Sequence, residues 1–120
     1  MPAEPDPSTL TDPEDAKLVT LARSTRARTQ AREGACVRDR DGRTYAGATI
    51  ELPSLRLSAV QVAVAMAVTS GARGLEAVVV LGGAETADEA DLSVVRELAG
   101  TGVPVHLAAP DGSVVATARS

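Results

Sequence analysis

The chain has 120 residues, a formal net charge of −4 and one cysteine. This length gives one domain with a single core, and one cysteine excludes both a disulfide framework and a thiolate metal site within one chain. The acidic balance argues against nucleic acid as a partner, because binding to the phosphate backbone needs a basic field.

The distribution of residue types limits the function further. Tyr45 is the only aromatic residue, so the core must consist of Ala, Val and Leu, and association through an Ala/Val surface is expected. The only basic cluster, at residues 23–32, is expected to be the solvated face of a helix. No signal-peptide pattern or membrane-length apolar run is present, so we expect a cytoplasmic protein that has no membrane partner.

The N-terminal region predicts a leader followed by a helix. The first ten residues hold three prolines among acidic and small polar residues, which is typical of a disordered segment. We therefore expect a disordered leader at 1–10 and a single domain at 11–120. Thr11 and Glu14 have capping-box spacing and predict the start of the first helix. Gly34 is expected to end this segment.

A β-hairpin is predicted next. Its strands are residues 35–38 and 43–50, and the sequence DRDG at 39–42 has the residues of a turn. Gly47 in the second strand indicates a close approach of another backbone. Cys36 lies in the first strand, where we expect a buried and inert thiol.

The segment 54–71 predicts a central helix. Residues 57–68 contain only two polar side chains, Ser58 and Gln61, so the helix has no polar face and is expected to be buried on most sides. A charge at Ala65 is then expected to unfold the domain. Unpaired backbone N–H groups gather at a helix N-terminus, which makes the start of this helix the expected place of a pocket.

The remaining chain alternates strands and helices. The apolar run at 75–81 predicts a strand buried on both faces, and a helix is expected at 88–99. Residues 103–109 and 113–118 predict a final antiparallel hairpin. The order α-β-β-α-β-α-β-β predicts an α/β fold, a three-layer α/β/α sandwich with a five-stranded mixed sheet. The strand–helix–strand links should join right-handed parallel neighbours.

Two stretches, EGACVRDRDGRTYAGATIE at 33–51 and LRLSAVQVAVAMAVTSGA at 55–72, resemble the small free-nucleoside cytidine deaminase family. The order of the elements also agrees, and the resemblance covers roughly residues 15–115. It implies a cytidine deaminase-like fold and assembly as dimers or tetramers. In such enzymes a zinc-bound hydroxide, held by three Cys or His ligands, and a nearby glutamate deaminate cytidine.

At the positions of this zinc site the sequence departs from the family pattern. Ser58 stands where the family's central helix carries a zinc ligand, and Val60 stands where it carries the catalytic glutamate. Asp91 and Val94 occupy the other two ligand positions. Because a hydroxyl and one carboxylate hold Zn²⁺ poorly without nitrogen or sulfur donors, we expect no metal, no cofactor and no catalytic residue here. The only histidine, His106, is expected to be structural.

Candidate ligand-binding residues lie near the start of the same helix. Glu51 matches the ribose-binding glutamate of the family, and Thr49 stands where the family has an asparagine. Ser58 is the third candidate, although a serine at this place is also typical of a helix N-cap. An exposed acidic residue at a strand end is also commonly just solvated.

The sequence leaves two hypotheses of function. In the first, the chain is a catalytically inactive cytidine deaminase-like protein that acts as a binding or interaction module and forms a homo-oligomer, a dimer or tetramer. Its ligand is then a nucleoside or a partner protein. In the second, it is an active cytidine deaminase that has a rearranged site. The substitutions at Ser58 and Val60 favour the first hypothesis.

Overall fold

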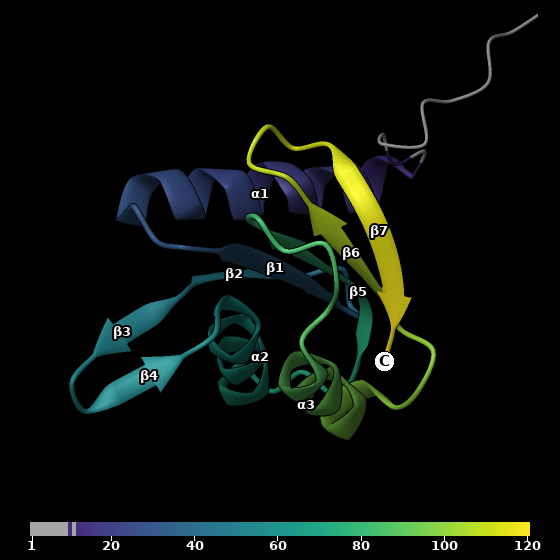
Figure 1. Ribbon diagram of the computed structural model, residues 1–120. Coiled ribbons are helices and arrows are strands. Elements are labelled where there is room, and N and C mark those ends of the chain that lie inside the picture. The colour runs from purple at the N-terminus through teal and green to yellow at the C-terminus, as the bar shows by residue number, and fades with distance from the viewer. Residues whose placement is uncertain (1–9, 11) are drawn as a thin grey trace, which may run out of the picture.

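The computed structural model describes Leu10 and residues 12–120, which form one main sheet, one small sheet and the helices around them (Figure 1). The main sheet has five strands in the order β2-β1-β5-β6-β7, and the small sheet pairs β3 with β4. The helices are α1 (Pro13–Thr29), α2 (Ala59–Thr69) and α3 (Glu89–Ala99). The strands are β1 (Gly34–Asp39), β2 (Thr44–Ala48), β3 (Ile50–Leu52), β4 (Leu55–Leu57), β5 (Leu75–Leu81), β6 (Pro104–Ala108) and β7 (Val114–Arg119).

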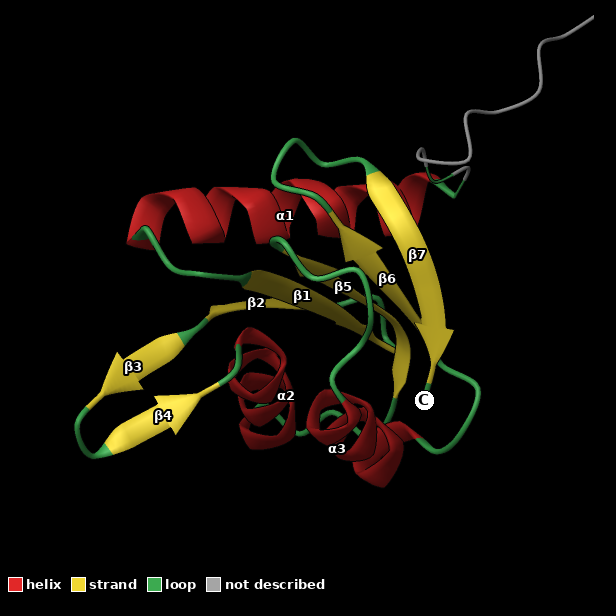
Figure 2. Ribbon diagram, viewed as in Figure 1, coloured by secondary structure: helices red, strands yellow, loops and turns green. Residues whose placement is uncertain are grey.

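The helices cover the two faces of the main sheet. Helix α1 lies on one face, and α2 and α3 lie on the other (Figure 2). This arrangement confirms the three-layer α/β/α fold with a five-stranded mixed sheet. The predicted leader lies outside the described residues except for Leu10. Within residues 12–120 no helix is both long and apolar enough to cross a bilayer.

The strand directions correct one part of the predicted topology. Strands β5 and β6, which α3 connects, are parallel neighbours as expected. Strands β2 and β5, which α2 connects, are not neighbours, because β1 lies between them and is antiparallel to both. The reason is the β1–β2 hairpin, which places β2 at the edge of the sheet and leaves only the other side of β1 for β5.

Helix α1 begins and ends at different residues from those predicted. The N-cap is Asp12, whose Oδ1 accepts a hydrogen bond from the backbone N of Glu14 at 2.8 Å. The C-cap is Gln30 in the left-handed conformation, with φ of 54°. Gly34 does not end the helix segment but starts β1, where a Cβ atom would lie only 2.2 Å from the carbonyl oxygen of Ala22 in α1. That glycine therefore allows α1 to lie close against the sheet.

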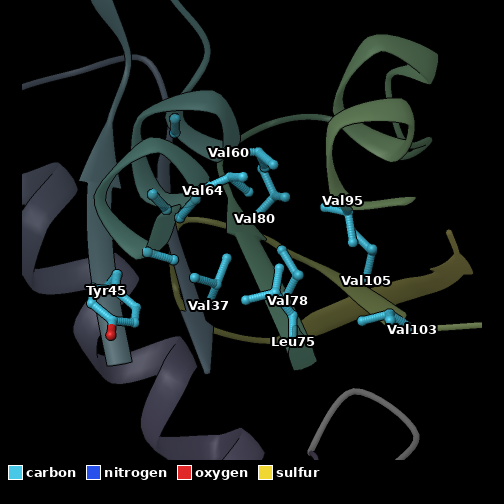
Figure 3. Packing of buried hydrophobic residues seen from close by; sticks show 14 of the residues in the cluster. Val37, Tyr45, Val60, Val64, Leu75, Val78, Val80, Val95, Val103 and Val105 are labelled. Atoms are coloured by element: carbon cyan, nitrogen blue, oxygen red, sulfur yellow. The ribbon is translucent and has the colours of Figure 1, made fainter. Parts of the chain in front are cut away.

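The core has a separate cluster on each face of the sheet. The larger cluster lies between the sheet and α2 and α3, and consists mostly of valines (Figure 3). The smaller one lies between the sheet and α1 and includes Leu18 and Cys36. Burial raises the pKa of the Cys36 thiol to about 12, which agrees with the predicted inert thiol.

Helix α2 packs against the sheet through small residues. A Cβ atom on Gly47 of β2 would lie 2.8 Å from the backbone N of Ala63, so the predicted close backbone approach is confirmed. The expectation that α2 is buried on most sides is wrong, because Ala65, Met66 and Val68 are exposed. A charged side chain at position 65 would therefore reach water, and it should cost much less stability than the sequence predicted. An apolar side chain does not have to be covered by its own chain.

The sequence analysis missed the small β3–β4 sheet. Its strands occupy residues 50–57, which were expected to be the end of a strand, a loop and the first turns of the central helix. Three-residue strands are too short to show the alternation that marks a strand in a sequence. As a result, α2 begins at Ala59, later than predicted.

Candidate functional site

The N-terminus of α2 is capped by side chains of its own segment. The Ser58 Oγ accepts a hydrogen bond from the backbone N of Gln61 at 3.0 Å, and the Gln61 Oε1 accepts one from the backbone N of Ser58 at 2.9 Å. This reciprocal pair is a capping box, so Ser58 is the N-cap that the sequence suggested. The same Ser58 hydroxyl donates to the Asp91 Oδ1 at 2.6 Å.

Asp91 brings a second helix to this place. It lies in the first turn of α3, which Asp88 caps by accepting a hydrogen bond from the backbone N of Ala90 at 2.8 Å. The Asp91 side chain is almost fully buried. Its burial raises the pKa of the carboxyl, the hydrogen bond from Ser58 lowers it in part, and the nearby charge of Asp88 raises it again.

Glu33 is a third member of this group, and the sequence analysis did not identify it. It lies between α1 and β1, and its burial together with the charges of Asp91 and Asp88 raises the pKa of its carboxyl, against the opposing charge of Arg32. Thr49 fixes the backbone here: its Oγ1 accepts from the backbone N of Glu33 at 3.0 Å and donates to the Glu33 carbonyl oxygen at 3.3 Å. The only sequence signal was a charged residue directly before a buried strand, and that pattern is also typical of a solvated turn.

These residues line two adjoining cavities. The first has a volume of about 270 Å³, with Glu33, Ser58 and Asp91 among its polar lining residues and Val80, Val105 and Leu107 from the sheet among its apolar ones. The second has a volume of about 350 Å³ and also includes Glu33 and Ser58. Arg32, Thr49, Glu51 and Arg56 complete much of its polar lining.

The structure brings most of the predicted site residues together. Thr49, Glu51 and Ser58, the candidate ligand-binding residues, all line the second cavity. Glu51 is exposed and its carboxylate pairs with the Arg32 guanidinium at 3.1 Å. The hydroxyls of the other two side chains already have partners within the chain. They can still accept a further hydrogen bond, but a ligand that needs a hydroxyl donor would have to displace one of these partners.

Two of the predicted positions lie away from the cavities. Val60 is fully buried in the larger core cluster, close to Val64 and Val80 (Figure 3). Val94 lines a different depression, a groove between α2 and α3. Neither side chain carries a polar atom, and the residues that would act on a ligand here are therefore carboxyls and hydroxyls from other positions.

The residues present do not fit a zinc ion. The resemblance assigns three positions to zinc ligands. The Ser58 hydroxyl is used in the capping box and in a hydrogen bond to Asp91, which in turn engages the Asp91 carboxyl. Val94 has no donor atom. The nitrogen and sulfur donors of the chain lie on the α1 face: Cys36 packs in the smaller cluster, and His106 Nε2 lies 3.1 Å from the Asp15 Oδ2. Within the described residues no group of three His, Cys, Asp or Glu side chains is placed to hold a metal ion.

The chemistry available at the cavities is that of a polar binding site. Two carboxyls with raised pKa values, Glu33 and Asp91, can accept or, when protonated, donate hydrogen bonds. The Ser58–Asp91 pair has no histidine between its members, so it lacks the base that activates a serine in hydrolases. Arg32 and Arg56 add positive charge at the open side.

Comparisons with known proteins agree on one family. Residues 11–112 match the family model described as "Cytidine deaminase-like". The cytidine deaminase from Burkholderia pseudomallei aligns with a TM-score of 0.74 at 24% identity, covering 85% of this chain and 89% of that one. The enzyme from Mycobacterium leprae aligns with a TM-score of 0.69 at 21% identity, covering 88% and 94%.

A third solved structure, the cytidine deaminase from Mycobacterium tuberculosis, has a TM-score of 0.68 at 23% identity and covers 78% of this chain and 85% of that one. A comparison with curated protein sequences finds no match. At these identities the similarity to the solved structures establishes the fold.

Proposed function

The chain belongs to the cytidine deaminase-like family, and from this premise we propose that it is a member that binds a ligand or partner without hydrolysing it. It acts as a binding module that assembles as a homo-oligomer, a dimer or tetramer, and works in the cytoplasm, where a free thiol such as Cys36 stays reduced. Fold alone does not carry activity, so the proposal rests on the residues of the site.

One observation carries this proposal. Hydrolytic deamination needs an activated water and a side chain that moves protons between that water and the base. The position that the family uses for this side chain is Val60, which is 0% exposed and faces the core. The neighbouring Ser58 hydroxyl is committed at 2.6 Å to Asp91 and at 3.0 Å to the backbone of α2. The Ser58 hydroxyl at the start of α2 is therefore used in hydrogen bonds within the chain and is not available to a metal ion.

The cavities still suit a small polar ligand, and a nucleoside is the first candidate. Its hydroxyl and amino groups can donate to the carboxyls of Glu33 and Glu51, and the sheet valines give its ring an apolar floor. The absence of an aromatic residue in the sequence before Glu33 removes a stacking partner for the base, so weak binding is expected. If no nucleoside binds, the same module serves a partner protein.

The alternative function is that of an active cytidine deaminase with a rearranged site. One observation favours it: the carboxyls of Glu33 and Asp91, whose pKa values are raised, line the same cavity as Ser58 at the N-terminus of α2. A carboxyl of this kind can serve as a general acid or base when it lies near a reacting group. The alternative still has to supply an activated water.

Turnover and metal content separate the two functions. We expect the purified full chain to hold less than stoichiometric zinc and to convert no cytidine to uridine, with or without added Zn²⁺. Steady conversion that disappears in Glu33→Gln would overturn the proposal in favour of the rearranged enzyme.

Ligand binding is measured separately by thermal shift. Cytidine or uridine at millimolar concentration is expected to raise the melting temperature, and Glu51→Ala is expected to abolish the rise, because ligand binding to the folded state alone stabilises it. Glu14→Ala is the matched control, since Glu14 also forms an exposed ion pair, with Lys17, but lies on α1. If no nucleoside changes the melting temperature, nucleoside binding is excluded and the partner-protein role remains.

A further inference from the structure

The first of the two cavities, with a volume of about 270 Å³, is lined by acids and by no cation. Its charged lining residues are Glu33, Asp88 and Asp91, and no Lys, Arg or His side chain of the described chain lines it. The cation whose charge acts on Glu33 is Arg32, which lines the second cavity but not the first and pairs there with Glu51 at 3.1 Å. The negative charge of the first cavity is therefore not balanced by its own wall.

Asp91 is the most buried of these acids, and one of its oxygens has no partner. The residue is only 7% exposed, and its Oδ1 accepts the hydrogen bond from the Ser58 hydroxyl at 2.6 Å. Its Oδ2 accepts no hydrogen bond from the part of the chain that the structure describes, and it is not among the atoms sealed from solvent. Because Asp91 lines the cavity, this oxygen faces it. A buried carboxylate is costly until a donor or a cation satisfies it, so Oδ2 is available to a ligand.

Glu33 contributes a second carboxylate from a different segment. Its side chain lies over Gly82, the residue after β5, where a Cβ atom would come within 2.9 Å of the Glu33 Cγ. The backbone of Glu33 is fixed by Thr49, but its carboxylate has no hydrogen-bond or ion-pair partner among the described residues. Burial, and after it the charge of Asp91, raises the pKa of this carboxyl, as expected for an acid that lacks a cation.

The start of α3 explains only part of this arrangement. Acids are stabilised at a helix N-terminus by the helix dipole, and this accounts for Asp88 and Glu89 in the first turn. It does not account for Asp91, whose carboxyl bonds to Ser58 at the start of another helix, or for Glu33, which belongs to no helix. The positive ends of α2 and α3 would by themselves favour an anion, so an anion has to be one of the ligands tested.

The rest of the wall is apolar, and the space is small. Val80 of β5 and Val105 and Leu107 of β6 line it, and the two valines are seen within the core cluster in Figure 3. Because one water takes about 30 Å³ of liquid, roughly nine non-hydrogen atoms fill this volume. A hydrocarbon chain gains from such a wall, whereas a metal ion does not, and the acids are not grouped to hold a metal ion within the described residues.

We propose that this cavity binds a small organic cation, a primary ammonium group on a short hydrocarbon chain, with the ammonium between Glu33 and Asp91 and the chain along the valines of the sheet. An ammonium group has three donors and no acceptor, which suits carboxylate oxygens that lack partners. The same group is present in free amines and at the end of a lysine side chain. This inference rests on the binding role proposed above, for which it names a class of ligand, but not on the absence of turnover.

The first experiment compares three probes of nearly equal size and different charge. The full chain, labelled with ¹⁵N, is titrated at neutral pH with n-pentylamine, 1-pentanol and pentanoate, and the backbone amide signals are followed by NMR. We expect n-pentylamine, which is protonated at this pH, to bind with a Kd of about 1 mM or lower. The alcohol and the anion are expected to bind at least about tenfold more weakly, because neither supplies a positive charge.

The second experiment removes the two carboxylates without changing their size. Glu33→Gln and Asp91→Asn are each expected to weaken n-pentylamine binding by at least about tenfold, because each removes a charged acceptor. Glu97→Gln is the matched control: it removes the same charge from α3 but at a different groove, and it should change the Kd by less than about twofold. Unchanged melting temperatures show that the fold is intact. Since Asp91 also bonds to Ser58, Glu33→Gln keeps the test valid if Asp91→Asn does not fold.

A further probe distinguishes the two sources of the ammonium group. Nα-acetyllysine amide carries the same alkylammonium chain on a peptide backbone. If it binds at least as tightly as n-pentylamine, the cavity accepts a lysine side chain of a partner protein. If it binds at least about tenfold more weakly, the ligand is a free amine, as the small volume of the cavity favours.

Three results would overturn the inference. One is n-pentylamine that binds no more tightly than 1-pentanol, and another is a loss of affinity that is as large in Glu97→Gln as in Glu33→Gln. The third is pentanoate as the tightest probe, which would mean that the helix N-termini determine the charge preference of the cavity. None of these results changes the expected absence of turnover or the thermal shift that depends on Glu51, so failure of this inference and failure of the proposed function are separate outcomes.

Discussion

The acidic side chains on the two faces of the main sheet differ in the charges that surround them. On the α1 face, Asp15 lies 2.9 Å from the Arg38 Nη1 and 3.1 Å from the His106 Nε2. Arg38 also pairs with Glu76 at 3.1 Å, and His106 Nδ1 lies 2.9 Å from the Thr117 hydroxyl. The acids on this face have cationic or hydrogen-bonding partners from other elements.

On the α2–α3 face the two acids beside the cavities, the half-buried Glu33 and the buried Asp91, have like charges as neighbours. Burial raises the pKa of both carboxyls; the charges of Asp91 and Asp88 raise the pKa of Glu33 further, and the charge of Asp88 raises that of Asp91. The Ser58 hydroxyl lowers the pKa of Asp91 in part, and the charge of Arg32 lowers that of Glu33. Removing one member of a buried charge network destabilises a fold, whereas carboxyls with raised pKa values beside a cavity are typical of functional sites. In this comparison the α1 face carries a network of opposite charges, and the acids beside the two cavities lie on the opposite face.

Removing the centre of the α1-face network is expected to have the largest effect. Arg38→Met removes the guanidinium from Asp15, which is largely buried, and leaves His106 as its one neighbouring partner, so we expect the free energy of unfolding to fall by about 3 kcal/mol. Urea denaturation followed by circular dichroism measures this change. Arg96→Met is the control, because its ion pair with Glu89 is exposed, and it should lower stability by less than about 1 kcal/mol. Equal losses in both variants would contradict the contrast between the faces.

A smaller loss is expected at the cap of α2. Ser58→Ala removes the N-cap hydroxyl and the hydrogen bond to Asp91, and we expect a loss of about 1–2 kcal/mol in the same denaturation experiment. Ser24→Ala, at an exposed position of α1, should leave stability unchanged. A neutral Ser58→Ala would mean that this hydroxyl is free for another role, and would weaken the argument against catalysis.

The smallest effect is a change in pH dependence. The pKa of Glu33 is raised in the folded chain above its ordinary value of 4.5, so the folded state holds this proton more tightly than the unfolded chain. Stability from this group is then greatest at low pH and falls as the pH rises through the raised folded-state pKa. Glu33→Gln should therefore gain stability over the wild type above this range and none below it.

Melting temperatures of the two chains between pH 4 and 8 measure the difference. The difference between the curves reports the Glu33 carboxyl together with its effect on the neighbouring Asp91, because the other titrating groups are common to both chains. A wild type that gains stability over Glu33→Gln with rising pH would mean that this carboxylate has a cationic partner, which would remove the contrast with the α1 face.

The sequence predicted the parts of the fold that depend on local patterns. Strand β5 was predicted at 75–81 and is found there, because a short valine-rich run with a glycine on each side is typical of a buried strand. The turn at Gly42 and the close approach at Gly47 also follow from residues whose conformational or steric freedom is unusual. The order of the elements predicted the three layers, and the family resemblance agreed with it.

Contacts between distant segments could not be predicted in the same way. The His106–Asp15 contact joins residues 91 positions apart, and no local pattern indicates it. Glu33 was not identified as a candidate from the sequence, because the charges of Asp88 and Asp91 that act on its carboxyl come from a segment more than fifty residues further along the chain. The β3–β4 hairpin is held by pairing across a short turn, and its apolar face becomes visible only when the register is known.

The sequence by itself therefore determined the order of the three helices and of the five strands of the main sheet, and the apolar character of the central helix. It also placed Ser58 and Val94 at positions where the family resemblance implies zinc ligands. These follow from residue types and spacing, which do not depend on the fold. Only the tertiary structure decided that the Ser58 hydroxyl donates a hydrogen bond to Asp91, that Glu33 lines the same cavity, and that one side of α2 is exposed. Burial and charge proximity are properties of packing, and they distinguish the charge network on the α1 face from the acids beside the cavities on the other face.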